Sequence, residues 1–407
     1  MSSELKKPKL LAPAGDWRML NAAINNGADA VYFGVEVLNM RAKARNFVSD
    51  ELSELVTLAK EKNIETNLTI NTIVFEDELS DLDQIILKAK NAGIDFVICW
   101  DMAAIEKCIQ HEMAFCISTQ ASISNSASAK MYERLGAKRI VTARECSLEQ
   151  IKEIKQNTNL EVEAFIHGAM CVAVSGRCFM SHEAFGKSAN RGECIQPCRR
   201  EFEIRDKDGQ SEFIIGEDYV MSPKDLCTIE FVDQLIESGI DVFKIEGRKR
   251  APEYIAKVVS TYRKAIDLYF ENKLTYEIKK EMLAELGKVY NRGFSRGFYF
   301  ENPNSIDFSE KYGSSATTKK VYIGKVVNYF DQAQVAHILL QAGDLDVGDS
   351  IYVIGEKTGA IEMQVDSMFV NDVEAEHADK KDEITFKCSR PIRKGDQIYK
   401  IVEVEVT

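Results

Sequence analysis

Long hydrophobic runs are missing from this sequence: no apolar stretch approaches the roughly 20 residues needed to cross a bilayer. Near the start, MSSELKKPKLLAPAGDW contains only a short apolar stretch from Leu10 to Ala14, which is too short for the core of a secretory leader. We therefore expect no membrane association and a cytoplasmic location. In that compartment thiols stay reduced, so clustered cysteines indicate metal ligands or redox groups rather than structural disulfides.

Basic charge is also scarce. The chain has 52 Lys and Arg against 64 Asp and Glu, a net charge of −12. Such a chain has no overall attraction for the phosphates of nucleic acid, so any role on nucleic acid requires a local basic patch. One candidate patch is the run KIEGRKR, residues 244–250, although a short basic run of this kind is more often a solvated loop.

Two familiar functional motifs are absent, and a third lies outside its usual context. Without H-E-x-x-H the chain does not resemble the common metallopeptidases. The one G-x-S-x-G match, GFSRG at residues 293–297, lies in a predicted irregular linker rather than between a strand and a helix, so it does not indicate a common serine hydrolase. No G-x-G-x-x-G follows a predicted strand, which counts against a dinucleotide-binding doubly wound sheet.

A weak internal repeat organises the first 270 residues: a helix end, a Gly followed by Ala or Ile, and then an apolar run. The repeats are NNGADAVYFG, NAGIDFVICW, RLGAKRIVTA and ESGIDVFKIEG. The Gly fits a left-handed helix cap, and the apolar run fits a strand buried on both faces. Strands are predicted at 9–13, 28–34, 64–70, 95–100, 113–119, 139–144, 161–167 and 241–247. Eight strands alternating with helices predict an α/β fold of the TIM-like (β/α)8 barrel type, with a doubly wound sheet as the alternative.

The predicted domain boundaries lie where the alternation of strands and helices is interrupted. A barrel is predicted over 1–275, with a cysteine-rich cap at about 168–216 inserted between the last two strands. Because loops that follow barrel strands form the active face, we expect the cap to cover the mouth of the barrel. A linker is predicted over 276–317, and short strands with Gly-Asp turns predict a small C-terminal β-barrel over 318–407.

Four of the ten cysteines, Cys171, Cys178, Cys194 and Cys198, fall in the segment CVAVSGRCFMSHEAFGKSANRGECIQPC. Their spacing lacks the paired knuckles of common zinc sites, whereas iron–sulfur sites tolerate irregular spacing. Cys227 is an alternative to Cys198 as the fourth ligand. We expect the remaining five cysteines to be small buried hydrophobic residues.

The stretch EAFIHGAMCVAVSGRCFMS resembles the signature of the peptidase U32 family. Further similarity lies in LLAPAGDWRMLNAAINNGADAVYFG, TQASISN, ANRGECIQPC, MSPKDLC and DVFKIEGRKR, which together span residues 10 to about 250. The length and the appended β-domain resemble the branch implicated in forming 5-hydroxyuridine at the wobble position of tRNA. In a related branch that hydroxylates ubiquinone without oxygen, the matching cysteines hold a [4Fe–4S] cluster.

This resemblance implies an iron–sulfur protein that hydroxylates tRNA without molecular oxygen, with prephenate as a candidate hydroxyl donor. It leaves the redox partner unidentified. Two alternatives remain: a peptidase, and a non-catalytic accessory protein of a hydroxylation complex. A thiolate bound to iron cannot also act as a free nucleophile, which disfavours proteolysis by these cysteines.

The predicted site residues lie at the ends of strands. Candidate catalytic residues are Gln120, Arg144, Glu163 and His167. Candidate substrate-binding residues are Arg41, Arg45, Asn71, Lys244, Glu246 and Arg248. Several cationic groups at one mouth suit a small anionic co-substrate, because arginine pairs with a carboxylate or phosphate through two hydrogen bonds.

Overall fold

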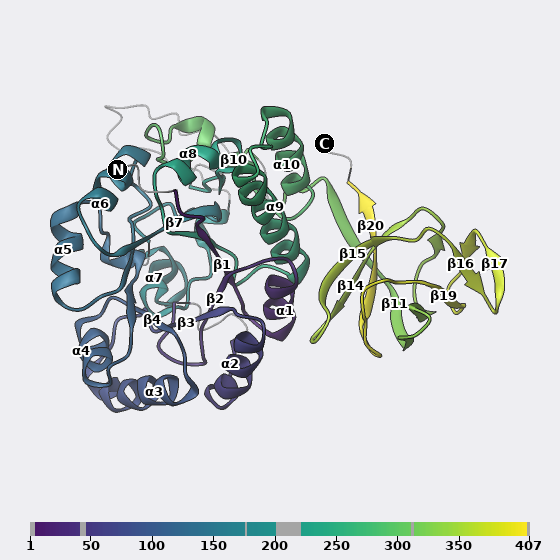
Figure 1. The fold of residues 1–407 in the computed structure, drawn as a ribbon, viewed down its shortest axis with the longest axis horizontal. Helices are drawn as coiled ribbons and strands as arrows, with labels where there is room; N and C mark the ends of the chain where they lie inside the picture. The colour runs from purple at the N-terminus through teal and green to yellow at the C-terminus, as the bar shows by residue number, and fades with distance from the viewer. Residues whose placement is uncertain (1–4, 41–45, 176, 201–220, 311–312, 405–407) are drawn as a thin grey trace.

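The computed structural model describes residues 5–40, 46–175, 177–200, 221–310 and 313–404. An α/β barrel and a C-terminal domain of antiparallel strands lie side by side (Figure 1). Among the described residues, no helix combines the length and the apolar character needed to cross a membrane.

Eight parallel strands form the barrel: β1 (Lys9–Pro13), β2 (Ala30–Phe33), β3 (Glu65–Thr69), β4 (Phe96–Cys99), β5 (Phe115–Ile117), β6 (Arg139–Val141), β7 (Glu161–Gly168) and β9 (Val242–Ile245). Each strand pairs with the next, and β9 pairs with both β7 and β1, so the ring is closed. Each strand overlaps a range predicted from the repeats. The TIM-like barrel is therefore confirmed over the doubly wound alternative.

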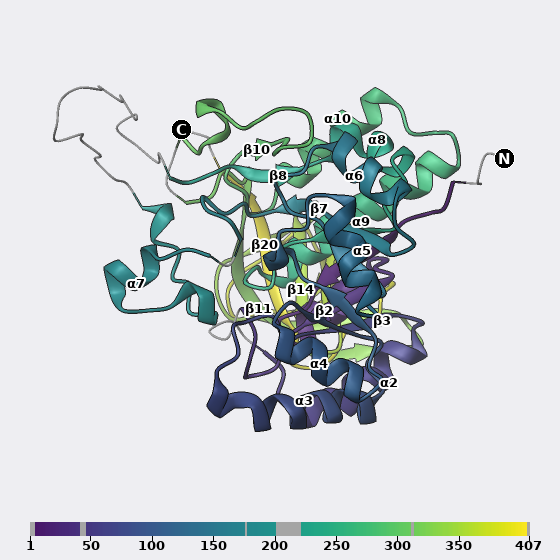
Figure 2. The same cartoon turned by 90° about the vertical axis from the view of Figure 1, so that its left-hand side faces the viewer.

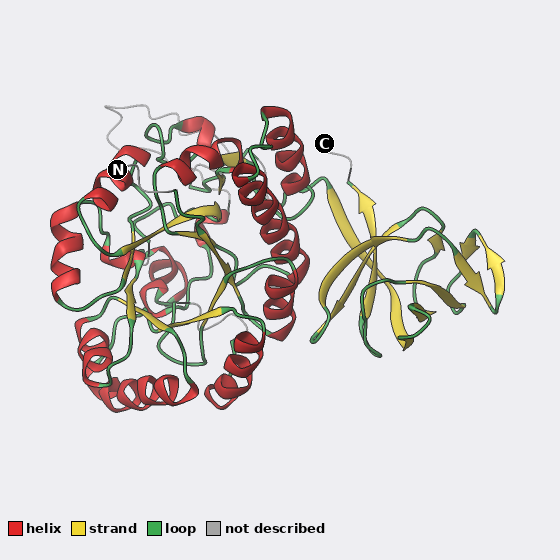
Figure 3. Cartoon of the chain, viewed as in Figure 1, coloured by secondary structure: helices red, strands yellow, loops and turns green. Residues whose placement is uncertain are grey.

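Helices surround this ring on the outside (Figure 3). They are α1 (Trp17–Asn25), α2 (Leu52–Glu61), α3 (Leu79–Ala92), α4 (Met102–Gln110), α5 (Ser126–Arg134), α6 (Leu148–Gln156), α8 (Val232–Glu237) and α9 (Pro252–Phe270). The Asp16 carboxylate caps α1 by accepting from the Met19 amide at 2.9 Å. Gly93 ends α3 in the left-handed conformation, with φ of 81°, as the repeat predicts.

The segment between β7 and β9 carries the predicted cap. It contains α7 (Met180–Phe185), which stands away from the barrel on the left of Figure 2, and β8 (Asp225–Cys227), which pairs antiparallel with β7. Residues 201–216 of the predicted cap lie outside the described residues. Of the cap, the structure therefore describes the part that carries the four clustered cysteines.

The predicted linker at 276–317 differs from the structure in its first part. Helix α10 (Tyr276–Gly287) begins there, capped by the Thr275 side chain, and buries Met282 and Leu286 against the barrel core. The short strand β10 (Phe294–Ser295) then pairs with β8. The apolar side of α10 explains the difference, because it gives the segment a packed position on the barrel.

The C-terminal domain is made of antiparallel strands with its own hydrophobic core. Its strands are β11 (Thr318–Phe330), β12 (Val335–Leu340), β13 (Leu345–Asp346), β14 (Ser350–Gly355), β15 (Gly359–Gln364), β16 (Met368–Val370), β17 (Val373–Ala375), β18 (His377–Ala378), β19 (Glu383–Lys387) and β20 (Gln397–Glu403). The turn at Gly359 packs against α1, where the Asn21 amide donates to the Glu356 carbonyl at 2.7 Å. The predicted all-β character of this domain is confirmed.

Candidate active site at the barrel mouth

Charged residues fill the interior of the barrel, and they are paired with one another. Arg139 is completely buried; its guanidinium lies 2.8 Å from the Glu65 carboxylate and 2.6 Å from that of Glu161. Burial acts to raise the pKa of Glu65, but Arg139 and Lys9 outweigh it and lower that pKa to about 2. These residues lie toward the amino ends of the strands, opposite the mouth.

Glu163 links this ionic network to the mouth. One of its carboxylate oxygens lies 2.6 Å from the Lys244 ammonium group, and the other lies 3.6 Å from Arg139. Glu163, predicted as a catalytic residue, is thus fully buried beneath the mouth and contacts it through Lys244. The arrangement follows from strand alternation, which turns Glu161, Glu163 and Phe165 of β7 to the same face.

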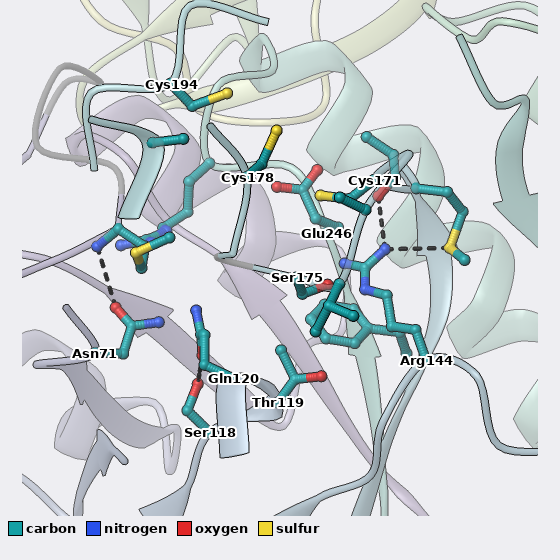
Figure 4. Close-up of a pocket in the computed structure, with 18 of the residues that line it drawn as sticks. Asn71, Ser118, Thr119, Gln120, Arg144, Cys171, Ser175, Cys178, Cys194 and Glu246 are labelled. Atoms are coloured by element: carbon teal, nitrogen blue, oxygen red, sulfur yellow. Dashed lines mark hydrogen bonds between the residues drawn. The ribbon is translucent and has the colours of Figure 1, made fainter. Parts of the chain in front are cut away.

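A cavity of about 130 Å³ lies at the carboxyl ends of the strands, beneath the cap. Its lining includes Asn71, Gln120, Arg144, Lys244, Glu246 and Arg248 from the barrel, and Cys171, Cys178, Cys194 and Cys198 from the cap. Ten of the fourteen residues predicted for the site therefore meet at this cavity, several of which Figure 4 labels.

All four cap cysteines are free thiols. Among the described residues, no three or more His, Cys, Asp and Glu side chains are already arranged as a set of metal ligands. The donor chemistry nevertheless fits an iron–sulfur cluster, because four reduced sulfur atoms line the same cavity and soft thiolates favour such a group. Burial raises the pKa of the Cys198 thiol, and the neighbouring Arg199 acts in the opposite direction.

Cationic groups from the last barrel strand reach the same cavity. The Lys244 ammonium lies 4.5 Å from the centre of the Tyr32 ring and is held from below by Glu163. Arg248 donates to the Thr69 hydroxyl at 2.8 Å. A side chain at Gly34 would come within 2.9 Å of the Arg248 guanidinium, so the glycine leaves room for it.

Two further arginines of the cavity have buried nitrogen atoms without a hydrogen-bond partner in the described structure, namely Nε of Arg144 and of Arg199. The Arg144 guanidinium donates to the Ala169 carbonyl at 2.6 Å and lies 3.9 Å from the centre of the Phe165 ring. Arg199 donates to the carbonyls of Met170 and Pro223. Cations held by neutral partners retain positive charge for an anion that enters the cavity.

Neutral polar side chains also line the cavity. The Asn71 side-chain oxygen accepts from the Met40 amide at 3.1 Å, and the Ser118 hydroxyl donates to the side-chain oxygen of Gln120 (Figure 4). Both Asn71 and Gln120 are nearly buried, which gives each side chain a defined orientation. These amides can therefore recognise polar atoms of a ligand in a fixed geometry.

His167 was predicted as a catalytic residue, but the structure places it away from the cavity. Its ring packs against Tyr254, Tyr262 and Phe294, and Nδ1 lies 3.3 Å from the Tyr262 hydroxyl. Burial and the charge of Arg250 lower the pKa of His167 to about 3, so the ring is neutral near pH 7. This position is explained by the register shift of β7 between Phe165 and His167, which turns the ring outward.

Cys227 does not line the cavity either. Its sulfur is buried 3.8 Å from the Tyr262 hydroxyl, and burial raises its pKa to about 12. The geometry thus favours Cys198 over Cys227 as the fourth cysteine of the cap group. The five cysteines expected to be small buried hydrophobic residues (Cys99, Cys108, Cys116, Cys146 and Cys388) are all buried, as predicted.

Arg41 and Arg45, predicted to bind substrate, lie outside the described residues. Conversely, Tyr32, Ser118 and Arg199 line the cavity and were not predicted. Strand alternation would have placed Tyr32 inside the barrel with Ala30. Arg199 follows Cys198 directly, so its position next to a proposed ligand was visible in the sequence.

Comparison with known proteins relates the chain to several named relatives. It is 41% identical over 404 residues to an uncharacterized protease of Methanocaldococcus jannaschii, covering 97% of this chain and 98% of that protein. A Collagenase of Porphyromonas gingivalis is 36% identical over 404 residues, with 96% and 97% covered. The tRNA hydroxylation protein P1 of Bacillus subtilis is 36% identical over 357 residues, with 86% and 84% covered.

The family comparison covers most of the barrel and its cap. Residues 15–308 match the family described as Peptidase family U32, including every cysteine of the cap and every predicted residue of the mouth. This match spans well over half of the chain. The chain therefore belongs to peptidase family U32.

Proposed function

We propose that this chain hydroxylates RNA without molecular oxygen, and that its substrate is the wobble uridine of tRNA. One observation carries the proposal: the four cap cysteines line the same cavity as the cationic and amide groups of the barrel mouth. The Bacillus subtilis relative, 84% of which is covered by the match, is named for tRNA hydroxylation, and this supports the same conclusion.

In this proposal Cys171, Cys178, Cys194 and Cys198 hold a [4Fe–4S] cluster. When bound, such a cluster supplies one-electron chemistry at a position within reach of the mouth. The residues of the chain then have separate roles. Lys244 and Arg248 bind the carboxylate of a small anionic co-substrate, and Asn71 and Gln120 orient polar atoms of the reactants.

The expected change in the base replaces its C5–H bond by a C5–OH bond. If an alcohol such as prephenate donates the hydroxyl group and receives hydrogen in exchange, atoms and electrons balance without an external oxidant. A carboxylate-bearing donor suits the positive charge retained at Arg144 and Arg199, next to Lys244 and Arg248 in the same cavity. Glu246, on the same wall, provides an acidic group for proton transfer at the site.

The alternative of a peptidase is supported by the names of two relatives, the protease and the Collagenase. The site geometry gives it less support, since His167 is buried against α9 and does not line the cavity with the cysteines. A hydrolase using a cysteine nucleophile needs a base within hydrogen-bond reach of the sulfur. No cysteine–histidine hydrogen bond is present among the described residues of the cap, which include His182.

The test is complementation of a bacterial strain that lacks its own tRNA wobble-uridine hydroxylation protein. Digested tRNA is analysed by mass spectrometry for 5-hydroxyuridine, with wild type and Cys178→Ala compared at equal protein levels. We expect the modification with wild type and its loss with the variant. No modification by the wild-type protein, together with cleavage of a defined peptide that Cys178→Ala abolishes, would favour the peptidase instead.

A further inference from the structure

The cap presents exposed apolar side chains above the mouth. Phe179, directly before α7, is 73% exposed, and Phe185 at the end of the same helix is also exposed. Within the described structure, Phe179 has no aromatic or cationic partner against its ring. Large apolar side chains gathered in an exposed position and bordered by polar groups mark a surface that binds something.

The same segment is basic in an otherwise acidic protein. Residues 171–200 contain five Arg and Lys side chains but only two Glu, whereas the whole chain has a net charge of −12. A surface with local positive charge attracts polyanions, even when the overall charge of the protein opposes it. Arg191 pairs with Glu78, Lys187 lies 3.8 Å from Glu193, and Arg199 donates to backbone carbonyls at the cavity. The exposed Arg177 and Arg200 therefore carry the positive charge of this face, which favours a polyanion over a purely apolar partner.

Arginines of the cap lie over aromatic rings around the mouth. Arg200 is 4.6 Å from the centre of the Phe185 ring, Arg191 is 4.4 Å from Phe75, and Arg177 is 5.7 Å from Trp100. The last two rings belong to loops that follow β3 and β4, on the same carboxyl-end face of the barrel as the cavity.

These aromatic residues and arginines place planar groups on the cap and on two loops at the carboxyl end of the barrel, the end where the cavity lies. Aromatic rings and guanidinium planes are the side chains that stack on unpaired RNA bases, while duplex bases are hidden in their own stack. A base that reacts in the cavity must likewise leave its stack to reach the mouth. The chemistry of this rim therefore fits a single-stranded segment of RNA better than a duplex.

We propose that this face of the cap, with Phe75, Trp100 and Phe185 and their arginines around it, docks a single-stranded loop of the RNA substrate, and that Phe179 stacks on an unpaired base next to the reacting one. The inference rests on the proposed function and specifies where and how that substrate binds. Phe179 is a binding residue here, and it takes no part in the chemical step.

The test is direct binding of a fluorescent anticodon stem-loop RNA, measured by anisotropy with the full-length protein purified without oxygen. Stacking on an aromatic side chain contributes about 1–3 kcal/mol per base, so Phe179→Ala is expected to weaken binding by about 5- to 150-fold. Phe179→Trp keeps a stacking surface and is expected to bind like wild type. Phe369→Ala, which removes a 42% exposed ring from the distant hairpin at the right of Figure 1, is the control and is expected to leave affinity unchanged.

Because Phe179 follows Cys178, iron content and thermal unfolding are measured for each variant. Phe75→Ala provides a second, independent disruption, since Phe75 lies on the barrel loop and is 52% exposed. A loss of affinity in Phe75→Ala and Phe179→Ala with unchanged iron supports the docking face. Wild-type affinity in both variants overturns it.

Two other results separate this inference from the proposed function. If wild type binds a duplex of the same length as tightly as the loop, attraction by charge alone explains the binding and the stacking role is wrong. If wild type binds neither RNA, the docking face is overturned together with the RNA substrate of the proposed function. Hydroxylated tRNA together with wild-type affinity in both variants overturns the docking face alone, and the proposed function stands.

Discussion

The interior of the barrel and the cavity at its mouth both contain buried charged side chains, but the partners of those side chains differ. Inside the barrel, Arg139 is surrounded by Glu65, Glu161 and Glu163, and Lys244 closes the series. At the mouth, Arg144 and Arg199 are held by backbone carbonyls, and each has a buried Nε without a partner in the described structure.

The difference separates charge used for folding from charge available for binding. A buried ion needs compensating charge and hydrogen bonds, and the barrel interior supplies both from its own strands. The mouth supplies hydrogen bonds but less opposite charge, so its positive potential remains for an anionic ligand. Burial of charge therefore does not identify a functional site by itself; the partners of each charge do.

The largest expected effect concerns the four cap cysteines, which line the cavity at the mouth. Replacing Cys198 by Ala is expected to remove most of the bound iron and sulfide, because one ligand of the proposed cluster is lost. The measurement is iron and sulfide analysis with a visible absorption spectrum after anaerobic purification. Cys227→Ala is the control and keeps its iron, since Cys227 lies outside the cavity; the reverse pattern would show that the fourth ligand was misassigned.

Next in size is the disruption of the interior network. Arg139→Met leaves Glu65 and Glu161 without their buried partner, so the free energy of unfolding is expected to fall by about 3–5 kcal/mol. Urea unfolding followed by circular dichroism measures it. The exposed Arg134→Met change on α5 is expected to stay within about 0.5 kcal/mol of wild type. Equal effects of the two changes would contradict a structural role for the interior charges.

The third prediction is that His167 contributes to the stability of the fold and not to the reaction. Its pKa of about 3 in the folded protein lies below the ordinary value of 6.5, so the unfolded chain binds the proton more readily. Stability is therefore expected to decline as pH falls from 6.5 toward 3, by about 2 kcal/mol at pH 5.

His167→Gln is expected to lack that part of the decline when urea midpoints are compared at pH 7.5 and 5. It should also retain tRNA hydroxylation at pH 7.5. An unchanged pH dependence together with lost activity would instead place His167 in the reaction.

The smallest change in stability is expected for Arg248→Met at the mouth. Among the described contacts, Arg248 donates to the side-chain oxygens of Thr69 and Asn39, and the Thr69 hydroxyl keeps its own bond to the Phe33 carbonyl. Loss of these bonds is expected to cost about 1 kcal/mol. Modification of tRNA is expected to fall more than tenfold, because a cation that binds the co-substrate is lost. Full modification with wild-type stability would remove Arg248 from the proposed site.

Much of the fold was predictable from local signals. Glycines such as Gly93 end helices in the left-handed conformation, and apolar runs mark strands that are buried on both faces. Two-residue alternation also placed Lys244 of β9 and Glu246, directly after that strand, on one side, where both line the cavity. The structure of the segment 276–317 was harder to predict, because the amphipathic pattern of α10 is weak and the position of this helix depends on packing against the barrel.

The sequence by itself determined the alternation of strands and helices, the density of cysteines in one insertion, and the charged residues that alternate along β7 and β9. Only the tertiary structure decided which of these residues share a cavity. A single register shift in β7 turned His167 away from the mouth, and the antiparallel pairing of β8 carried Cys227 to the outer side. Both outcomes depend on pairing between segments distant in the chain, and the spacing of residues along one strand does not contain that information.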